Sequence, residues 1–141
     1  MARKAASKTD KGAEDGGYVV FARRFRPQTF ADVVGQPTVT AALRHALKTG
    51  RLAQAWLLTG PRGVGKTSLA RILAKALNCE KGKGAHGVAE EPCNACDACA
   101  SIQNGSALDV IEMDAATNRG IGDVQKLREN VGLAPSQLRF K

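Results

Sequence analysis

One short stretch of the sequence has the residue types and spacing of a phosphate-binding loop. Residues 60–67, GPRGVGKT, match the pattern G-x-x-x-x-G-K-T. Its glycines let successive backbone N–H groups turn inward toward phosphate oxygens, its lysine reaches the β- and γ-phosphates, and its threonine hydroxyl ligates Mg²⁺. We therefore predict binding of ATP with Mg²⁺, with Lys66 and Thr67 as the catalytic pair. The predicted contacts are Gly60, Pro61, Arg62, Gly63, Val64, Gly65, Lys66, Thr67 and Ser68.

The segments on either side of this loop support a phosphate site. The apolar run AWLLT at residues 55–59 leads into the loop, and an amphipathic helix is predicted to leave it over residues 66–78. The alternative is a glycine-rich turn that binds nothing. That alternative leaves Lys66 unexplained, because a cation at the start of a helix opposes the helix dipole unless an anion lies opposite.

All four cysteines lie together, at Cys79, Cys93, Cys96 and Cys99, with the spacing C-x13-C-x2-C-x2-C. Four thiolates suit a closed, tetrahedral Zn²⁺ site. An iron–sulfur cluster is the main alternative, although the x3-C-P continuation of the ferredoxin pattern is absent, and inert or redox thiols are a third. We expect His86, in the glycine-rich loop between the first two cysteines, to face solvent.

The remaining periodicity indicates which elements position these groups. Apolar spacing and a following glycine predict helices, and short apolar runs predict buried strands. The helices are expected over residues 37–49, 66–78, 97–104 and 123–131, and the strands over residues 55–59 and 108–113. Alternation of strands and helices is typical of an α/β domain with a parallel sheet.

Composition and charge point to a soluble, cytoplasmic protein with a polyanionic partner. The 141 residues carry a net charge of +8, and residues 18–78 hold ten basic residues against the single acid Asp32. Nucleic acid or nucleotide would account for this excess, and so would a solvated basic surface. Residues 1–17 are polar and predict a disordered tail. No apolar run is long enough for a membrane span or a secretory signal.

Four features together resemble the gamma/tau subunits of bacterial DNA polymerase III, the AAA+ ATPases of the sliding-clamp loader. Residues 22–36, ARRFRPQTFADVVGQ, resemble that family's opening segment. Residues 60–79 resemble its phosphate loop and helix, which run directly into the first cysteine. The cysteine module and residues 109–131 are similar to the parts that follow. The likeness covers residues 19–141.

The resemblance implies a P-loop NTPase of the AAA+ type. The ATPase part would comprise residues 18–141, with the zinc module inserted at residues 79–99. It also implies an adenine pocket lined by Ala22, Arg23, Val33, Val34 and Gly35. The partners would be other subunits of a hetero-oligomeric ring, the sliding clamp, primed DNA and the polymerase core, with no membrane.

The sequence departs from the family pattern in respects that bear on catalysis. The apolar strand ending in Asp-Glu, which holds Mg²⁺ and positions water in the family, does not occur in these residues. The sensor residues and the arginine supplied to a neighbouring subunit are not found in them either. Asp109, Glu112 and Asp114 are predicted on a different strand and do not substitute for it. We therefore expect an N-terminal fragment with an incomplete sheet, weak ATP binding and negligible hydrolysis.

Two other functions remain open on sequence grounds. One is a zinc-stapled nucleic-acid-binding module whose phosphate loop is vestigial. The other is a different AAA+ DNA-processing ATPase, such as a Holliday-junction helicase or a helicase loader, although the cysteine module argues against it.

Overall fold

The computed structural model describes residues 21–114 and 120–141, without the side chains of Ala22, Arg23 and Ala85. The predicted tail at residues 1–17 lies outside the described residues. In order along the chain the helical elements are α1 (Phe21–Arg24), α2 (Pro37–Thr49), α3 (Lys66–Asn78), the 3-10 turn η1 (Ala85–Gly87), α4 (Asp97–Asn104) and α5 (Ile121–Val131).

Helices α2, α3 and α4 have the bounds that the sequence predicts, and α5 begins two residues earlier than expected. Local signals explain these ends. A proline begins α2, and Gly50 ends it with a φ of 71°. Gly105 ends α4 with a φ of 73° and donates its N–H to the carbonyls of Ser101 and Ile102. Capping chemistry in the local sequence therefore determines where these helices stop.

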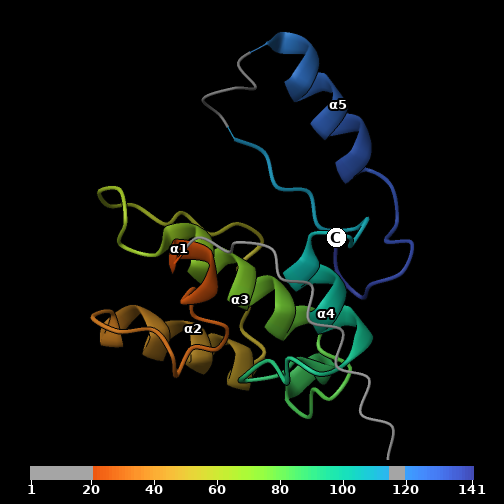
Figure 1. Cartoon of the computed structure of the whole chain (residues 1–141). Helices are drawn as coiled ribbons and strands as arrows, with labels where there is room; N and C mark the ends of the chain where they lie inside the picture. Colours follow the sequence, from red (N-terminus) through yellow and green to blue (C-terminus); the bar gives the residue numbers. More distant parts are fainter. Residues whose placement is uncertain (1–20, 115–119) are drawn as a thin grey trace, which may run out of the picture.

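Helix α3 is the centre of the molecule, with α2 on one side and α4 on the other (Figure 1). Its buried apolar side chains meet those of α2, together with one residue from the opening segment and one from the loop after η1. This main core comprises Phe30, Leu43, Leu47, Leu69, Ile72, Leu73, Ala76 and Val88. The helix that begins at the phosphate loop is thus held rigidly by packing along its length.

The predicted strands are not formed, and the parallel sheet of the predicted α/β fold is absent from the described residues. Leu57 is 88% exposed and Leu108 is 69% exposed, whereas the prediction placed both residues in buried strands. The physical reason is pairing: a strand satisfies its N–H and C=O groups through a neighbouring strand. Neither residues 55–59 nor residues 108–113 have such a neighbour in the described part of the chain.

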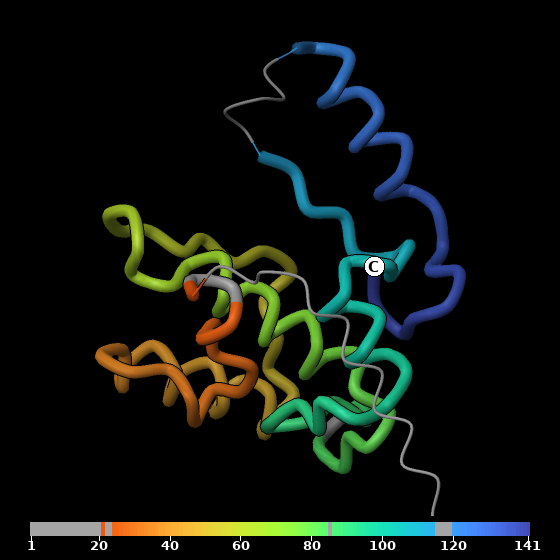
Figure 2. Tube along the Cα trace, viewed as in Figure 1, coloured from red at the N-terminus to blue at the C-terminus, as the bar shows by residue number. Residues whose placement is uncertain are grey.

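Helix α5 stands apart from the helical body, as Figures 1 and 2 show. Val124, Leu127 and Val131 recur at helical spacing along α5, but no residue of α5 is buried. After α5 the chain returns to the body, where Asn78 Oδ1 accepts a hydrogen bond of 2.8 Å from the N–H of Phe140. Among the described residues, no helix has the length and apolar character needed to cross a membrane.

Candidate nucleotide-binding site and four-cysteine centre

The phosphate loop keeps its backbone in a conformation that favours glycine. Gly63 and Gly65 have φ values of 85° and 97°, a region that residues with a side chain rarely adopt. A Cβ atom at either position would meet no atom within 4 Å, so backbone conformation rather than crowding explains these glycines. Gly65 is also the N-cap of α3 and supplies no side chain to that helix end. The first N–H groups of α3 therefore lack a side-chain cap, as an anion-binding helix end requires.

Lys66 folds back over the loop that precedes it. Its Nζ donates hydrogen bonds of 2.8 Å to the carbonyl of Gly60 and 2.6 Å to the carbonyl of Pro61. These contacts hold the ammonium group at the mouth of the loop although the helix dipole disfavours a cation there. The arrangement places a positive charge where a phosphate group would approach the N-terminus of α3.

The loop opens onto a cavity of about 830 Å³ whose other wall is the opening segment. Of the predicted contact residues, Val33 and Val34 lie on that wall, and residues 62–68 form the loop side. The full lining comprises Phe25, Arg26, Pro27, Asp32, Val33, Val34, Arg62, Gly63, Val64, Gly65, Lys66, Thr67, Ser68 and Asp114.

Some of the predicted contacts do not line the cavity. Gly60 and Pro61 face Lys66 through their carbonyls instead, and Gly35 is not among the lining residues. The side chains of Ala22 and Arg23 lie outside the described part of the chain. The two separated segments that the sequence assigned to one site nevertheless meet around one cavity.

The cavity also contains residues that the sequence reasoning did not assign to it. Phe25, Arg26 and Pro27 lie in the opening segment, between Arg23 and Val33, which the resemblance assigns to the adenine pocket. Their position between these two residues is the signal that could have identified them. Asp32 lines the wall but holds its own turn: it accepts hydrogen bonds from the N–H groups of Thr29 (2.9 Å) and Gln28 (3.2 Å). Hydrogen bonds from the side chain and backbone of Thr29 lower the pKa of Asp32, so this carboxylate stays ionised as a structural group.

The carboxylates of residues 108–114 differ in their contacts: two make structural contacts and one lies at the nucleotide cavity. Asp109 accepts hydrogen bonds from the backbone of residues 136–138. Glu112 pairs with Arg71 at 2.7 Å. Neither lines the cavity, whereas Asp114 does. The expectation was that Asp109, Glu112 and Asp114 do not substitute for the family's Asp-Glu pair. The contacts of Asp109 and Glu112 agree with it, whereas Asp114 lies at the cavity, so for this residue the expectation remains a prediction.

The four cysteines converge at the junction of α3 and α4. Cys79 directly follows α3, Cys96 is the N-cap of α4, Cys99 lies in the first turn of α4, and Cys93 comes from the preceding loop. All four Sγ atoms lie within 4.8 Å of one another. A tetrahedral ion with metal–sulfur distances of about 2.3 Å would require sulfurs about 3.8 Å apart, so small side-chain adjustments suffice.

The environment of these thiols also suits a cation. Burial raises the pKa of Cys79 and of Cys99 above the ordinary thiol value. The N–H of Ala95, 3.5 Å from the sulfur of Cys93, lowers the pKa of that thiol to about 6. Ionising several close, buried thiols is unfavourable without a compensating positive charge. A divalent ion would supply that charge, and Cys79, Cys93, Cys96 and Cys99 are its candidate ligands.

A glycine loop that leads into a helix beginning with Lys-Thr defines the class of P-loop nucleotide-binding proteins. The chain belongs to the family described as "DNA polymerase III, delta subunit", whose sequence profile matches residues 35–141. This match covers the phosphate loop and the cysteine module. Together with the tau and gamma/tau relatives described next, it confirms the predicted resemblance to the gamma/tau subunits.

Individual relatives agree with this membership. The chain is 51% identical over 124 residues to "DNA polymerase III subunit tau" of Escherichia coli (strain K12), covering 88% of this chain and 18% of the relative. It is 49% identical over 124 residues to the protein of the same name from Bacillus subtilis (strain 168), covering 88% of this chain and 21% of the relative. The subunit gamma/tau of Mycobacterium bovis is 46% identical over 121 residues, covering 84% and 20%. The chain thus spans about a fifth of the length of these relatives.

Proposed function

We propose that this chain is the ATP-binding part of a clamp-loader subunit of the replicative DNA polymerase III holoenzyme. In this role ATP binding and hydrolysis are coupled to loading of the sliding clamp on primed DNA during replication. The observation that carries the proposal is the cavity between the phosphate loop and Val33 and Val34, two segments about thirty residues apart in the chain. The 49–51% identity to two tau subunits supports the same role.

The residues around the cavity suggest how the nucleotide is held. The backbone N–H groups of residues 63–68 receive the phosphates, and Lys66 exchanges its contacts with the Gly60 and Pro61 carbonyls for phosphate oxygens. Thr67 would hold Mg²⁺, which neutralises charge on the phosphates. The base is assigned to the opposite wall, at Val33 and Val34 and, from the resemblance, at Ala22 and Arg23.

Binding and hydrolysis make different demands on these residues. Hydrolysis needs a carboxylate that positions the attacking water. Asp109 and Glu112 are engaged with residues 136–138 and with Arg71 instead. Asp114 lines the cavity but does not belong to an apolar strand ending in Asp-Glu, the source of that carboxylate in the family. These contacts support the expectation that the 141 residues alone bind ATP but hydrolyse little of it.

The cysteine centre, within the proposed module at residues 79–99, is assigned to one structural Zn²⁺ ion. An iron–sulfur cluster places its cysteine sulfurs on different irons and so holds them farther apart than ligands of a single ion. Four Sγ atoms within 4.8 Å of one another favour the single ion. Metal analysis is expected to find one zinc per chain, and a brown protein containing acid-labile sulfide would contradict this assignment.

The proposed partners follow from membership of the clamp loader. They are the other subunits of a hetero-oligomeric ring, the sliding clamp, primed DNA and, in the full-length protein, the polymerase core. The alternative of a nucleic-acid-binding module with a vestigial loop predicts that DNA binding does not depend on Lys66.

The test of the proposed function is Lys66→Ala, with Lys48→Ala as the control because Lys48 is an exposed lysine in the last turn of α2. We expect Lys66→Ala to weaken Mg-ATP binding at least tenfold, equivalent to about 1.4 kcal/mol, measured by titration calorimetry. Lys48→Ala should bind as wild type. Unchanged ATP binding in Lys66→Ala, or DNA binding that is independent of both ATP and Lys66, would contradict the proposal.

A further inference from the structure

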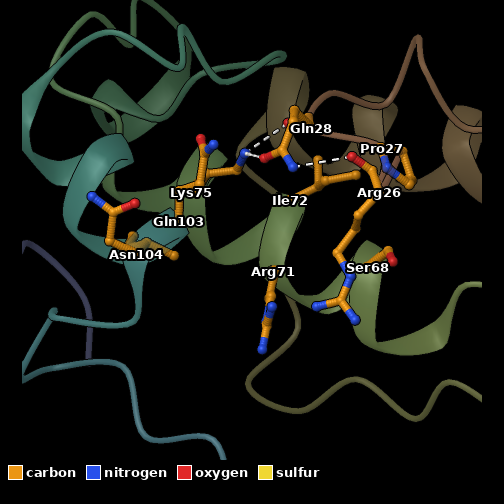
Figure 3. A pocket seen from close by; sticks show the side chains of 10 residues that line it. Arg26, Pro27, Gln28, Ser68, Arg71, Ile72, Lys75, Gln103 and Asn104 are labelled. Atoms are coloured by element: carbon orange, nitrogen blue, oxygen red, sulfur yellow. Dashed lines mark hydrogen bonds between the residues drawn. The ribbon is translucent and has the colours of Figure 1, made fainter. Parts of the chain in front are cut away.

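Lys75 connects the cysteine centre to the opening segment. It lies on α3 between the phosphate loop and Cys79, and only 2% of it is exposed. Its Nζ donates to the carbonyl of Gln28 at 2.8 Å and to Gln28 Oε1 at 2.9 Å, both drawn in Figure 3. A third hydrogen bond, of 2.7 Å, goes to Asn94 Oδ1. A lysine is seldom buried without partners, and here three oxygens surround the ammonium group.

The two ends of this connection lie in the two proposed sites. Asn94 falls between Cys93 and Cys96, with a φ of 54° that places it in the turn joining these cysteines. At the other end, Gln28 Nε2 donates a hydrogen bond of 3.0 Å to the carbonyl of Arg26, a residue that lines the nucleotide cavity. A continuous series of hydrogen bonds therefore runs from the cysteine turn through Lys75 and Gln28 to the cavity wall.

The space around this series adjoins the nucleotide cavity. A smaller cavity of about 160 Å³ is lined by Gln28 and Lys75 (Figure 3). It shares Arg26, Pro27 and Ser68 with the nucleotide cavity. The hydrogen-bonded lysine thus lines a cavity whose walls are partly those of the nucleotide cavity.

Glu91 makes a second, independent connection. It precedes Cys93 by two residues, and its Oε2 accepts a hydrogen bond of 2.9 Å from the N–H of Phe30. Phe30 is 2% exposed and begins the turn that leads to Val33 on the cavity wall. The neighbouring Glu90 pairs with Arg44 at 3.0 Å, and Glu91 pairs with the same arginine at 3.2 Å. The contact with Phe30 is therefore what distinguishes Glu91 from Glu90.

We propose that the four-cysteine centre supports the base-facing wall of the nucleotide cavity, so that metal occupancy and nucleotide affinity are coupled through Asn94, Lys75 and Glu91. The inference rests on the proposed function. Cysteine side chains are not among the cavity-lining residues, so the coupling passes through these hydrogen bonds rather than through contact with nucleotide. Metal at Cys93 and Cys96 closes the turn that presents Asn94, and by linkage bound nucleotide favours retention of the metal.

The test compares the full chain with variants that keep the cysteines. Asn94→Gly removes the side-chain acceptor yet tolerates the positive φ, and Asn94→Asp restores an oxygen at that place. Glu91→Ala removes the acceptor for Phe30, and Glu90→Ala is its matched control because it removes only an Arg44 pair. Each protein is titrated with a fluorescent ATP analogue and Mg²⁺ before and after chelation of zinc, and zinc per chain is measured alongside.

We expect chelation to weaken nucleotide binding by wild type at least about fivefold, the lower end of ordinary coupling between sites. Asn94→Gly and Glu91→Ala should keep their zinc yet bind nucleotide more weakly. In the variant carrying both changes, chelation should cause little further loss, because the connection is already broken. Asn94→Asp and Glu90→Ala should bind as wild type. Nucleotide should also slow zinc loss to the chelator in wild type and not in the double variant.

Two results would overturn the coupling alone. One is nucleotide affinity that depends on Lys66 but is unchanged by chelation. The other is a loss on chelation that is equally large in wild type and in the double variant. A wild-type chain that does not bind nucleotide would overturn the proposed function and this inference with it.

Discussion

Asp109 shows how a single carboxylate organises a distant part of this chain. Its oxygens accept hydrogen bonds from the N–H and hydroxyl of Ser136, at 2.8 and 3.1 Å. They also accept from the N–H groups of Gln137 and Leu138, at 2.7 and 2.8 Å. These backbone hydrogen bonds, that of Ser136 foremost, hold the pKa of Asp109 well below its usual range. The carboxylate therefore secures residues 136–138 against the segment that follows α4.

The direction of the pKa shift of Asp109 determines how pH affects this attachment. Because the folded pKa is below the unfolded value, the stabilisation is fully present above the unfolded pKa, about 3.9. It is lost progressively as the pH falls from there through the folded pKa. We expect the amides of residues 137 and 138 to lose their protection from hydrogen exchange in that acidic range before α3 unfolds.

The variant Asp109→Asn tests the same contact at neutral pH. An amide group replaces one acceptor by a donor, which then faces a backbone N–H. Exchange at residues 137 and 138 should accelerate at pH 7, with α2 and α3 unaffected, as measured by NMR. Asp123→Asn, on the exposed helix α5, is the control. Unchanged exchange in Asp109→Asn would show that Asp109 does not hold this segment.

At the scale of elements, the cysteines join two helix ends. Cys79 follows the last turn of α3, and the sulfur of Cys96 accepts a hydrogen bond of 3.5 Å from the N–H of Cys99 at the start of α4. The same side chain is thus both a proposed metal ligand and a helix cap. The buried members of the second cluster are Cys79, Ala89, Cys96, Ala98 and Cys99, and Leu138 is the one larger apolar side chain packed against them. A metal would therefore contribute much of what holds this part together.

Two substitutions at Cys96 separate these roles. Both Cys96→Ser and Cys96→Ala should release the bound zinc, because the thiolate is lost. Serine still caps α4 and alanine does not, so Cys96→Ala should be less stable than Cys96→Ser by about 0.5–2 kcal/mol. Metal analysis and denaturant unfolding measure the two effects. Full zinc occupancy in either variant would contradict the assignment of Cys96 as a ligand.

At the scale of the whole molecule, exposed apolar side chains are found on the two segments that fail to form strands and on helix α5. Leu57, Ile121 and Val131 are 88%, 80% and 70% exposed, respectively. Apolar surface of this kind is normally covered by another element or by a partner. The helical body is therefore well packed, while residues 55–59, residues 108–113 and α5 present an uncovered apolar surface.

This exposure predicts association of the 141-residue chain. Its sedimentation coefficient should rise with protein concentration, because burial of apolar side chains between copies is favourable. Leu133, just beyond α5, is 61% exposed. A variant with Leu57→Lys and Leu133→Lys should remain monomeric at higher concentration, whereas Gln54→Lys, at an exposed polar position, should not help. A chain that remains monomeric over the whole concentration range would contradict this reading of the surface.

The folded structure shows where several of the basic residues behind the positive net charge lie. Lys75 is buried among oxygen acceptors, and Arg71 pairs with Glu112 at 2.7 Å. Arg26, Arg62 and Lys66 line the nucleotide cavity. Part of the positive charge that suggested a polyanionic partner thus serves internal contacts, and another part faces the proposed phosphate site.

The sequence by itself determined the features that depend on neighbouring residues. The bounds of α2 and α3 follow from apolar periodicity with Gly50 and Gly65 at their ends, and the phosphate loop and the cysteine spacing are local patterns. Only the tertiary structure decided what depends on distant residues. Residues 55–59 have strand-like composition but no partner strand among the described residues. In the sequence Lys75 looks like an ordinary helical lysine, and only the structure shows that Gln28 and Asn94 bind its ammonium group. The reason is physical: helix hydrogen bonds and caps close within a few residues, whereas strand pairing and the satisfaction of a buried charge require groups far apart in the chain.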